Sequence, residues 1–311
     1  MSHPPASTVG GQAVIEGVMM RAPNRWAVAV RRPDGVIEAR SDPLPRLSSR
    51  SRLARIPFFR GVMVLGESLS LGFRALSWSA MKAGGEEEGE ELKPHHIAGA
   101  MVLALIVFIG FFMLLPLLVA RGAEKAFGES VVLFNVIDGL ARVLLFVGYI
   151  WAIGRSKDIK RVFEFHGAEH KTIHAYEAGD PLTLDAIQKY SPRHPRCGTN
   201  FLLIVILIAI VVFTAVGRPS LLWLITSRIV LIPVIAGIAY EVLKAAASAR
   251  WLAFFSKPGI WLQRLTTAEP AADQVEVAVA SLLVSLDDAE RESVKARGPV
   301  LPGALAYEVG A

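Results

Sequence analysis

Four of the seven histidines in the chain fall within one short stretch: His166, His170, His174 and His194. The first two flank Glu169 in an H-x-x-E-H pattern, the inverted form of a zinc-enzyme signature. Residues four apart on an α-helix lie one turn apart on the same face, so both imidazoles can reach one metal ion. The spacing predicts that His166 and His170 bind a metal and that Glu169 serves as general acid or base.

Other potential ligands surround this helical pair. His174 and Glu177 continue the same stripe, which is too long for one ion to use in full. Either adjacent pairs of the stripe share an ion, or some members, such as His174 and Glu177, hydrogen-bond to the ligands instead of binding the metal. His194 and Cys197 lie three residues apart in a proline-containing segment. Imidazole and thiolate together suit Zn²⁺. The sequence therefore predicts zinc held by the helical pair with His194 and Cys197.

Three interpretations of this cluster stay open. Three protein ligands and a water molecule are typical of a hydrolase, whereas four protein ligands are typical of a structural metal. Without a metal, the histidines would form a hydrogen-bonded cluster that responds to pH. Cys197 is the only cysteine, which excludes an internal disulfide and leaves it as a ligand or a small buried residue.

The elements that position these residues include long apolar blocks. Apolar residues make up 53% of the 311, the mean hydropathy is +0.44, and the net charge is +5. Blocks of about 20 apolar residues are long enough to cross a bilayer. We therefore expect an α-helical integral membrane protein with about four transmembrane helices, arranged as two hairpins over 97–154 and 201–247 and joined by a His-rich loop over 155–200.

The basic residues indicate the orientation of the chain. Thirteen Lys and Arg precede residue 97 and eight lie in the 155–200 loop, against two in 121–130 and one in 217–219. By the positive-inside rule, both termini and the loop are cytoplasmic. The basic residues flank apolar blocks, so we expect contacts with anionic lipids rather than a specific nucleic-acid site, and the ribosome or translocase stays open as a partner.

Four charged residues fall within or near the predicted spans: Asp138, Arg142, Arg228 and Glu241. Asp138 and Arg142 are four apart and can pair on one helix face. Such charges mark either a polar path for a substrate or ion pairs that fix helix packing, and we favour the second.

The remaining segments flank the spans. We expect a disordered tail over 1–9, a β-hairpin element with a basic linker over 10–60, and an interfacial amphipathic helix with an acidic linker over 61–96. Interfacial and amphipathic helices are expected over 248–311, with an apolar helical stripe at five positions: Val275, Val279, Leu282, Leu283 and Leu286.

Three motifs resemble a known family: Gly10–Arg21 (GGQAVIEGVMMR), the His166–Glu177 run, and His194–Asn200 (HPRCGTN). They are similar to the YqhQ-like family of multi-pass bacterial membrane proteins, a domain of unknown function labelled as predicted metal-dependent enzymes. The resemblance extends over about residues 10–286. It implies a bacterial cytoplasmic (inner) membrane protein with a metal site at four residues: His166, His170, His194 and Cys197.

The Gly10–Arg21 motif contains three glycines and two charged residues that suggest a separate role. Gly10, Gly11 and Gly17 permit close approach of the backbone to another group. Glu16 and Arg21 are long enough to reach the metal loop or a ligand. A tight β-structure that needs glycines at its bends is the equally weighted alternative.

The function these features favour is that of a zinc-dependent membrane enzyme, a hydrolase acting at the cytoplasmic face. A non-enzymatic membrane scaffold or quality-control factor with a structural metal, working with other membrane proteins, is the alternative. A transporter with a water-filled path past Asp138, Arg142 and Arg228 is a weaker one.

Overall fold

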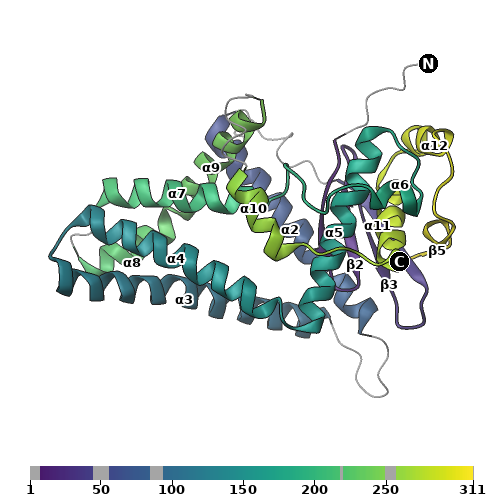
Figure 1. The fold of residues 1–311 in the computed structure, drawn as a ribbon. Helices are drawn as coiled ribbons and strands as arrows, with labels where there is room; N and C mark the ends of the chain where they lie inside the picture. The colour runs from purple at the N-terminus through teal and green to yellow at the C-terminus, as the bar shows by residue number, and fades with distance from the viewer. Residues whose placement is uncertain (1–7, 45–55, 85–93, 218–219, 249–256, 311) are drawn as a thin grey trace.

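A computed structural model describes residues 8–44, 56–84, 94–217, 220–248 and 257–310. The chain is mostly helical and has two parts (Figure 1): an elongated set of helices at one end and a small sheet packed with further helices at the other. Most of the predicted N-terminal tail, the basic linker and the acidic linker lie outside the described residues.

The sheet has five strands in the order β1-β2-β3-β4-β5. The first four form an antiparallel meander, and the last pairs in parallel with β4. The predicted hairpin is confirmed as β3 and β4, and the Gly10–Arg21 motif before it forms a second hairpin of β1 and β2. The bounds are β1 Gly10–Val14, β2 Gly17–Arg21, β3 Arg25–Arg31, β4 Ile37–Pro43 and β5 Tyr307–Val309.

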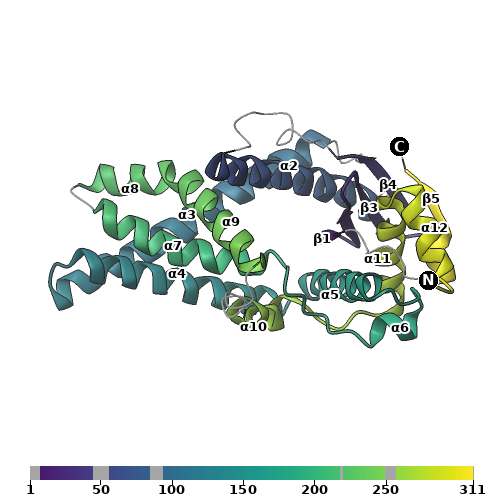
Figure 2. The ribbon, with the colours of Figure 1, turned by 90° about the horizontal axis from the view of Figure 1, so that it is seen from above.

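Alternate residues of each strand point to opposite sides of the sheet, and both of these faces are covered by helices. One face packs under α2 (Pro57–Ala83), where Trp26 and Val28 meet Leu71 and Trp78. The 27-residue α2 runs alongside both parts of the molecule (Figure 2), so it connects the sheet to the apolar helices.

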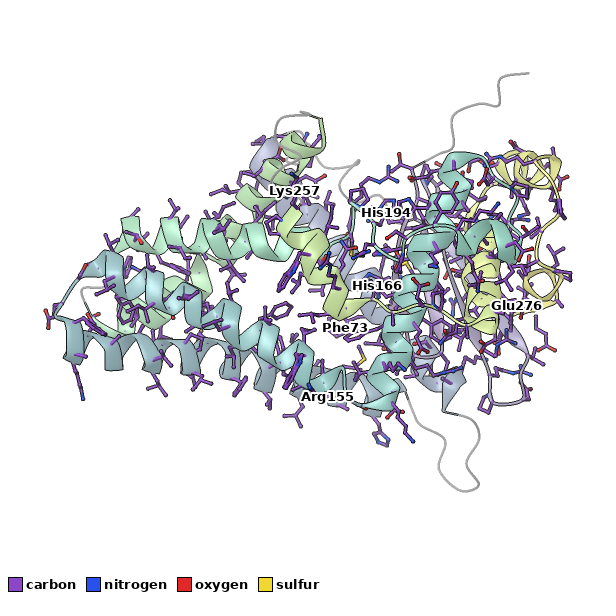
Figure 3. The ribbon with its side chains drawn as sticks, in the orientation of Figure 1. Phe73, Arg155, His166, His194, Lys257 and Glu276 are labelled. Atoms are coloured by element: carbon purple, nitrogen blue, oxygen red, sulfur yellow. The ribbon has the colours of Figure 1, made fainter. Side chains whose placement is uncertain are left out.

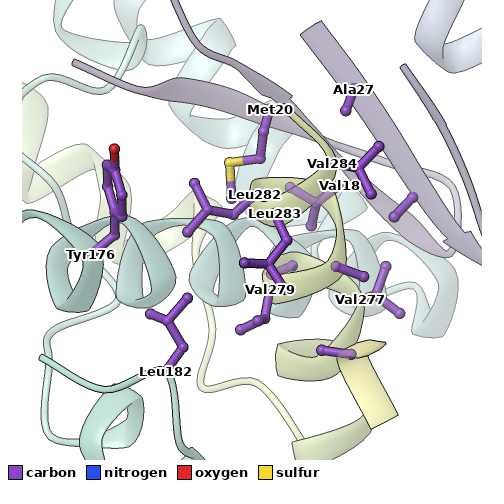
Figure 4. Close-up of a cluster of buried hydrophobic side chains, with 14 of the residues drawn as sticks. Val18, Met20, Ala27, Tyr176, Leu182, Val277, Val279, Leu282, Leu283 and Val284 are labelled. Atoms are coloured by element: carbon purple, nitrogen blue, oxygen red, sulfur yellow. The ribbon is translucent and has the colours of Figure 1, made fainter. Parts of the chain in front are cut away.

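The opposite face of the sheet carries the main core (Figure 4), built with α5 (Lys157–Ala178) and α11 (Ala272–Ser285). All five residues of the predicted C-terminal stripe are buried here. Val18 and Met20 of the sheet meet Leu282 and Leu283 of α11 in this cluster. Three short elements complete this part: α6 Leu184–Gln188, α12 Asp288–Ala296 and the 3-10 helix η3 Pro302–Leu305.

The elongated part consists of α3 Pro94–Phe127, α4 Val131–Ile153, α7 Thr199–Val216, α8 Leu221–Val230, α9 Ile232–Ser248 and α10 Lys257–Thr266. Among the described residues, α3 and α4 are long and apolar enough to cross a membrane, and the bent pair α8–α9 would be a third such span. Many large apolar side chains on α3 are exposed, Leu103 and Leu118 by more than 60%. A membrane is the environment that fits such a surface.

The last apolar segment differs from the single helix we expected as the second half of the 201–247 hairpin. It consists of α8 and α9, which are bent by 43° at Leu231. Pro233 lies at the second position of α9, where its missing N–H costs no helical hydrogen bond. The proline therefore explains why a new helix begins here.

The charges within these helices are paired. Arg142 and Arg228 both contact the Asp138 carboxylate at 3.1 Å, which confirms the expected Asp138–Arg142 pair and adds a second guanidinium from α8. Glu241 of α9 pairs with Arg60 of α2 at 2.6 Å. These contacts join α4 to α8 and α2 to α9, which supports the interpretation of the charges as helix-packing ion pairs.

Candidate metal centre

The helix α5 positions the three histidines of the predicted stripe. It begins after Ser156, only three residues beyond α4, and ends at Gly179, whose φ of 79° is the left-handed conformation typical of a helix C-terminus. Its face toward the sheet is apolar and contributes Phe165 and Tyr176 to the core. The histidines lie on the side away from that core, toward α10 and the loop before α7 (Figure 3).

Three of the predicted ligands converge. One ligand atom each of His166, His170 and Cys197 lie within 4.8 Å of one another, and the Cys197 Sγ is 3.4 Å from the His166 Nε2. The centroids of the two imidazole rings are 4.4 Å apart. The i, i+4 spacing on α5 thus brings both rings to one point, and the loop delivers the thiol to it.

Backbone carbonyls set the tautomers of both imidazoles. The Nδ1 of His166 lies 2.8 Å from the carbonyl oxygen of Thr266, and the Nδ1 of His170 lies 2.7 Å from that of Pro192. A carbonyl only accepts, so each Nδ1 carries the proton and each Nε2 keeps its lone pair for a ligand. This is the arrangement commonly found behind metal-bound histidines.

Burial favours the uncharged forms of two of the three groups, His170 and Cys197, in the absence of an ion. Desolvation lowers the pKa of His170 to about 2, with the neighbouring His166 adding to the effect. Desolvation also raises the pKa of the Cys197 thiol, against an opposing effect of the backbone N–H groups of Thr199 and Gly198 at the start of α7. A dication would reverse this situation, because it binds the neutral imidazoles and the thiolate.

Glu169, the predicted catalytic carboxylate, is buried beside the three ligands. Burial raises its pKa to about 8, while His166 and the backbone N–H of Gly11 act in the opposite direction. Its Oε2 is buried and has no hydrogen-bond partner among the described residues. A buried carboxyl with one unsatisfied oxygen next to three potential ligands is a group available for proton transfer.

His194 does not join the three converging ligands and belongs to a neighbouring cluster. Its ring lies 4.4 Å from that of His174, and its Nε2 lies 3.6 Å from a carboxylate oxygen of Glu177. Its Nδ1 accepts a hydrogen bond from the N–H of Arg196, whose guanidinium also pairs with Glu177. Desolvation lowers the pKa of His194 to about 4. The described geometry therefore favours three protein ligands over the four expected from the sequence.

Gln263, which orients this loop, was not among the predicted site residues. It is fully buried on α10, where its amide donates to the carbonyl of His194 and accepts from the N–H of His194. The two hydrogen bonds attach the loop backbone at His194 to α10. A glutamine on the apolar side of an interfacial helix was the available signal.

Glu16 and Arg21, expected near the metal loop, serve as attachments at a distance from it. Glu16 forms a two-pronged ion pair with Arg161 at the beginning of α5. Arg21 donates to the hydroxyl of Ser68 on α2. Both residues fix the β1–β2 hairpin between α5 and α2.

The site lies where the two parts of the molecule meet. Cys197 precedes α7 by two residues, and His166 contacts the last residue of α10. At the end of α4, the guanidinium of Arg155 stacks over the ring of Trp151.

Taken together, the fold and the site define a helical protein with two to three candidate membrane spans, a small sheet, and a His–His–Cys centre between them. Residues 56–288 match the family model described as "Protein of unknown function (DUF1385)", so the chain belongs to that family. The chain is also 36% identical over 293 residues to "Uncharacterized protein YqhQ" of Bacillus subtilis (strain 168), covering 89% of this chain and 91% of that protein. No solved structure matches it. The expected family membership is confirmed.

Proposed function

We propose that this protein is a zinc-dependent hydrolase of the bacterial cytoplasmic membrane, with its site on the cytoplasmic face. The observation that carries the proposal is the convergence of His166, His170 and Cys197 beside the buried Glu169. Two imidazoles and a thiolate suit Zn²⁺, and three protein ligands leave its fourth position open.

The donor set fits this ion in a further respect. Both Nδ1 protons are held by backbone carbonyls, so the two Nε2 atoms need no rearrangement to bind. The Cys197 Sγ lies 3.4 Å from the His166 Nε2, close enough for both atoms to bind one ion. When bound, Zn²⁺ supplies a Lewis acid that activates water and polarises an acyl carbonyl.

Glu169 performs the proton transfers of this reaction. It removes a proton from the attacking water, whose oxygen forms a bond to the acyl carbon, and returns the proton to the leaving group as the acyl bond breaks. The N–H of Gly11 holds the carboxyl in place through one hydrogen bond, and the unpartnered Oε2 is free to face the water. Burial excludes other water from the carboxyl.

The membrane part of the proposal has α3, α4, α7 and the α8–α9 pair as four spans, with both termini and α5 in the cytoplasm. The exposed apolar surface of α3 and the Trp151–Arg155 stack at the end of α4 support it. The excess of Lys and Arg before residue 97 and in 155–200 supports the orientation and contacts with anionic lipids.

The test is metal content together with an open coordination position. The wild type is expected to hold about one Zn²⁺ per chain, which Cys197→Ser and His166→Ala lose and Glu169→Gln retains. His194→Ala is the control for the number of ligands, and it is expected to retain the ion. Loss of zinc from His194→Ala would favour four protein ligands, and with them the scaffold with a structural metal.

The open position has a readout that does not depend on a known substrate. Cobalt-substituted protein is expected to show a thiolate-to-cobalt charge-transfer band that changes when acetohydroxamate, a small chelator, is added. A band that is insensitive to acetohydroxamate would argue against catalysis, because the fourth position would then be filled by the protein.

A further inference from the structure

Strand β1 lies at one edge of the sheet, directly beside the candidate metal centre. It pairs only with β2 among the described residues, so its other side has no neighbouring strand. It also packs against α5, the helix that carries the ligands. This edge belongs to the GGQAVIEGVMMR motif, whose role the ligand set leaves unexplained.

The pairing with β2 shows which backbone groups of β1 point outward. In an antiparallel pair, alternate residues direct both their N–H and their C=O to the partner strand, and the residues between direct both away. The N–H of Gly11 donates to Glu169 on α5. Gly11 therefore belongs to the outward set, and so does Ala13, two residues further along.

The glycines leave this edge accessible next to the catalytic carboxyl. Gly10 and Gly11 are exposed, and neither carries a side chain to cover the backbone. A Cβ on Gly11 would lie 3.0 Å from the Glu169 carboxyl carbon. The outward C=O of Gly11 and the outward N–H and C=O of Ala13 thus follow one another along the strand edge that begins beside Glu169.

We infer that the substrate is an extended segment of polypeptide that pairs with the outer edge of β1 and presents a peptide bond to the metal centre. This inference rests on the proposed hydrolase function. Alternating donors and acceptors along a strand edge match another polypeptide backbone, which is how many proteins bind extended peptides. A lipid or sugar ester has no such alternation. The position of Cys197 just before α7 places the segment at the membrane surface.

The reaction is then hydrolysis of an amide. The oxygen of water bonds to the carbonyl carbon, the C–N bond breaks, and Glu169 transfers the proton to the leaving nitrogen. The products are a carboxylate and a protonated amine, which takes up both protons of the water, and no oxidant or further reactant is needed. Strand pairing would hold the carbonyl in a fixed orientation, because each added hydrogen bond restricts the extended backbone.

The experiment compares hydroxamates on zinc-loaded protein in detergent. A short alanine-rich peptide hydroxamate is expected to bind at least 10-fold more tightly than acetohydroxamate. N-methylation of the peptide at successive positions is expected to weaken binding by about 3- to 10-fold at every second position only, because each methyl removes one N–H. That period of two is specific to strand pairing.

A protein variant checks the same contact. Ala13→Pro removes an outward N–H while leaving the β2 ladder intact, as an edge strand allows. It is expected to weaken the peptide hydroxamate about 3- to 10-fold and leave acetohydroxamate binding and zinc content unchanged. Equal affinities of the two hydroxamates, or N-methyl effects without alternation, would overturn the polypeptide substrate and leave the hydrolase in place. Failure of acetohydroxamate itself to bind would overturn both.

Discussion

The contact between Gly11 and Glu169 makes a quantitative prediction for two neighbouring glycines. A Cβ at Gly11 would lie 2.5 Å from the carbonyl oxygen of Met19 and 3.0 Å from the Glu169 carboxyl. Ordinary carbon–oxygen contacts begin at about 3.3 Å, so the Met19 contact alone requires a displacement of roughly 0.8 Å. A Cβ at Gly10 would meet nothing within 4 Å. Gly10→Ala is therefore the matched control for Gly11→Ala.

The displaced groups are a ladder carbonyl and a buried carboxyl, and neither yields easily. We expect Gly11→Ala to lower the free energy of unfolding by about 1–3 kcal/mol, as for overpacking elsewhere. At about 2–4 °C per kcal/mol, the melting temperature falls by roughly 2–12 °C. Gly10→Ala should change the free energy of unfolding by less than about 0.5 kcal/mol. Thermal unfolding in detergent, followed by circular dichroism, measures both.

A second substitution separates the two contacts. In the Gly11→Ala background, Glu169→Ala removes the carboxyl contact but not the Met19 contact, so it should recover part of the lost stability. Zinc content should stay near one per chain in Gly11→Ala, because the ligands come from α5 and the loop before α7. Equal stabilities of Gly10→Ala and Gly11→Ala would refute the close contacts at Gly11, and the absence of any recovery on adding Glu169→Ala would refute the contact with α5.

Three further predictions concern the proposed ligands and the charges of the apolar helices. Zinc binding at pH 7 should release between about one and two protons, because the raised pKa values of Cys197 and Glu169 keep both groups protonated without the ion. The zinc affinity should then rise about 10- to 100-fold per pH unit. Calorimetry in buffers of different protonation enthalpy measures the number of protons released. Cys197→Ser, which is expected to lose its zinc on purification, should release fewer protons per ion than the wild type when titrated with excess zinc, and an unchanged count would exclude the thiol as a ligand. Asp138→Leu leaves Arg142 and Arg228 without their shared carboxylate and should cost about 3–5 kcal/mol, whereas replacing all three residues with Leu should restore most of the melting temperature.

The local features of this molecule were predictable from the sequence because they depend on spacing within one element. The convergence of His166 and His170 follows from the helical repeat, and the β3–β4 hairpin follows from a turn between alternating residues. The stripe on α11 follows from the same periodicity. Each of these patterns is complete within about 15 residues.

The features that were missed depend on contacts between distant segments. Strand β5 has three residues and is specified by its pairing with β4, more than 260 residues earlier. His194 was expected at the metal, but Gln263 holds its backbone from α10 and the N–H of Arg196 occupies its Nδ1. Its ring therefore lies with His174 and Glu177. Nothing in the local sequence His-Pro-Arg-Cys distinguishes a His194 ring directed at the proposed metal ligands from one directed at His174 and Glu177.

The β1–β2 hairpin shows why a single motif near the N-terminus matters to a site more than 140 residues away. Glu16 forms an ion pair with Arg161 of α5, and the Gln12 side chain donates to the carbonyl of Gly72 on α2. The position of Glu169 relative to α2 is thereby fixed through one short strand. Since α2 also pairs with α9 through Arg60, the same hairpin couples the Glu169 carboxyl to the apolar helices. The glycines of the motif allow the close approach, and its polar residues make the approach rigid.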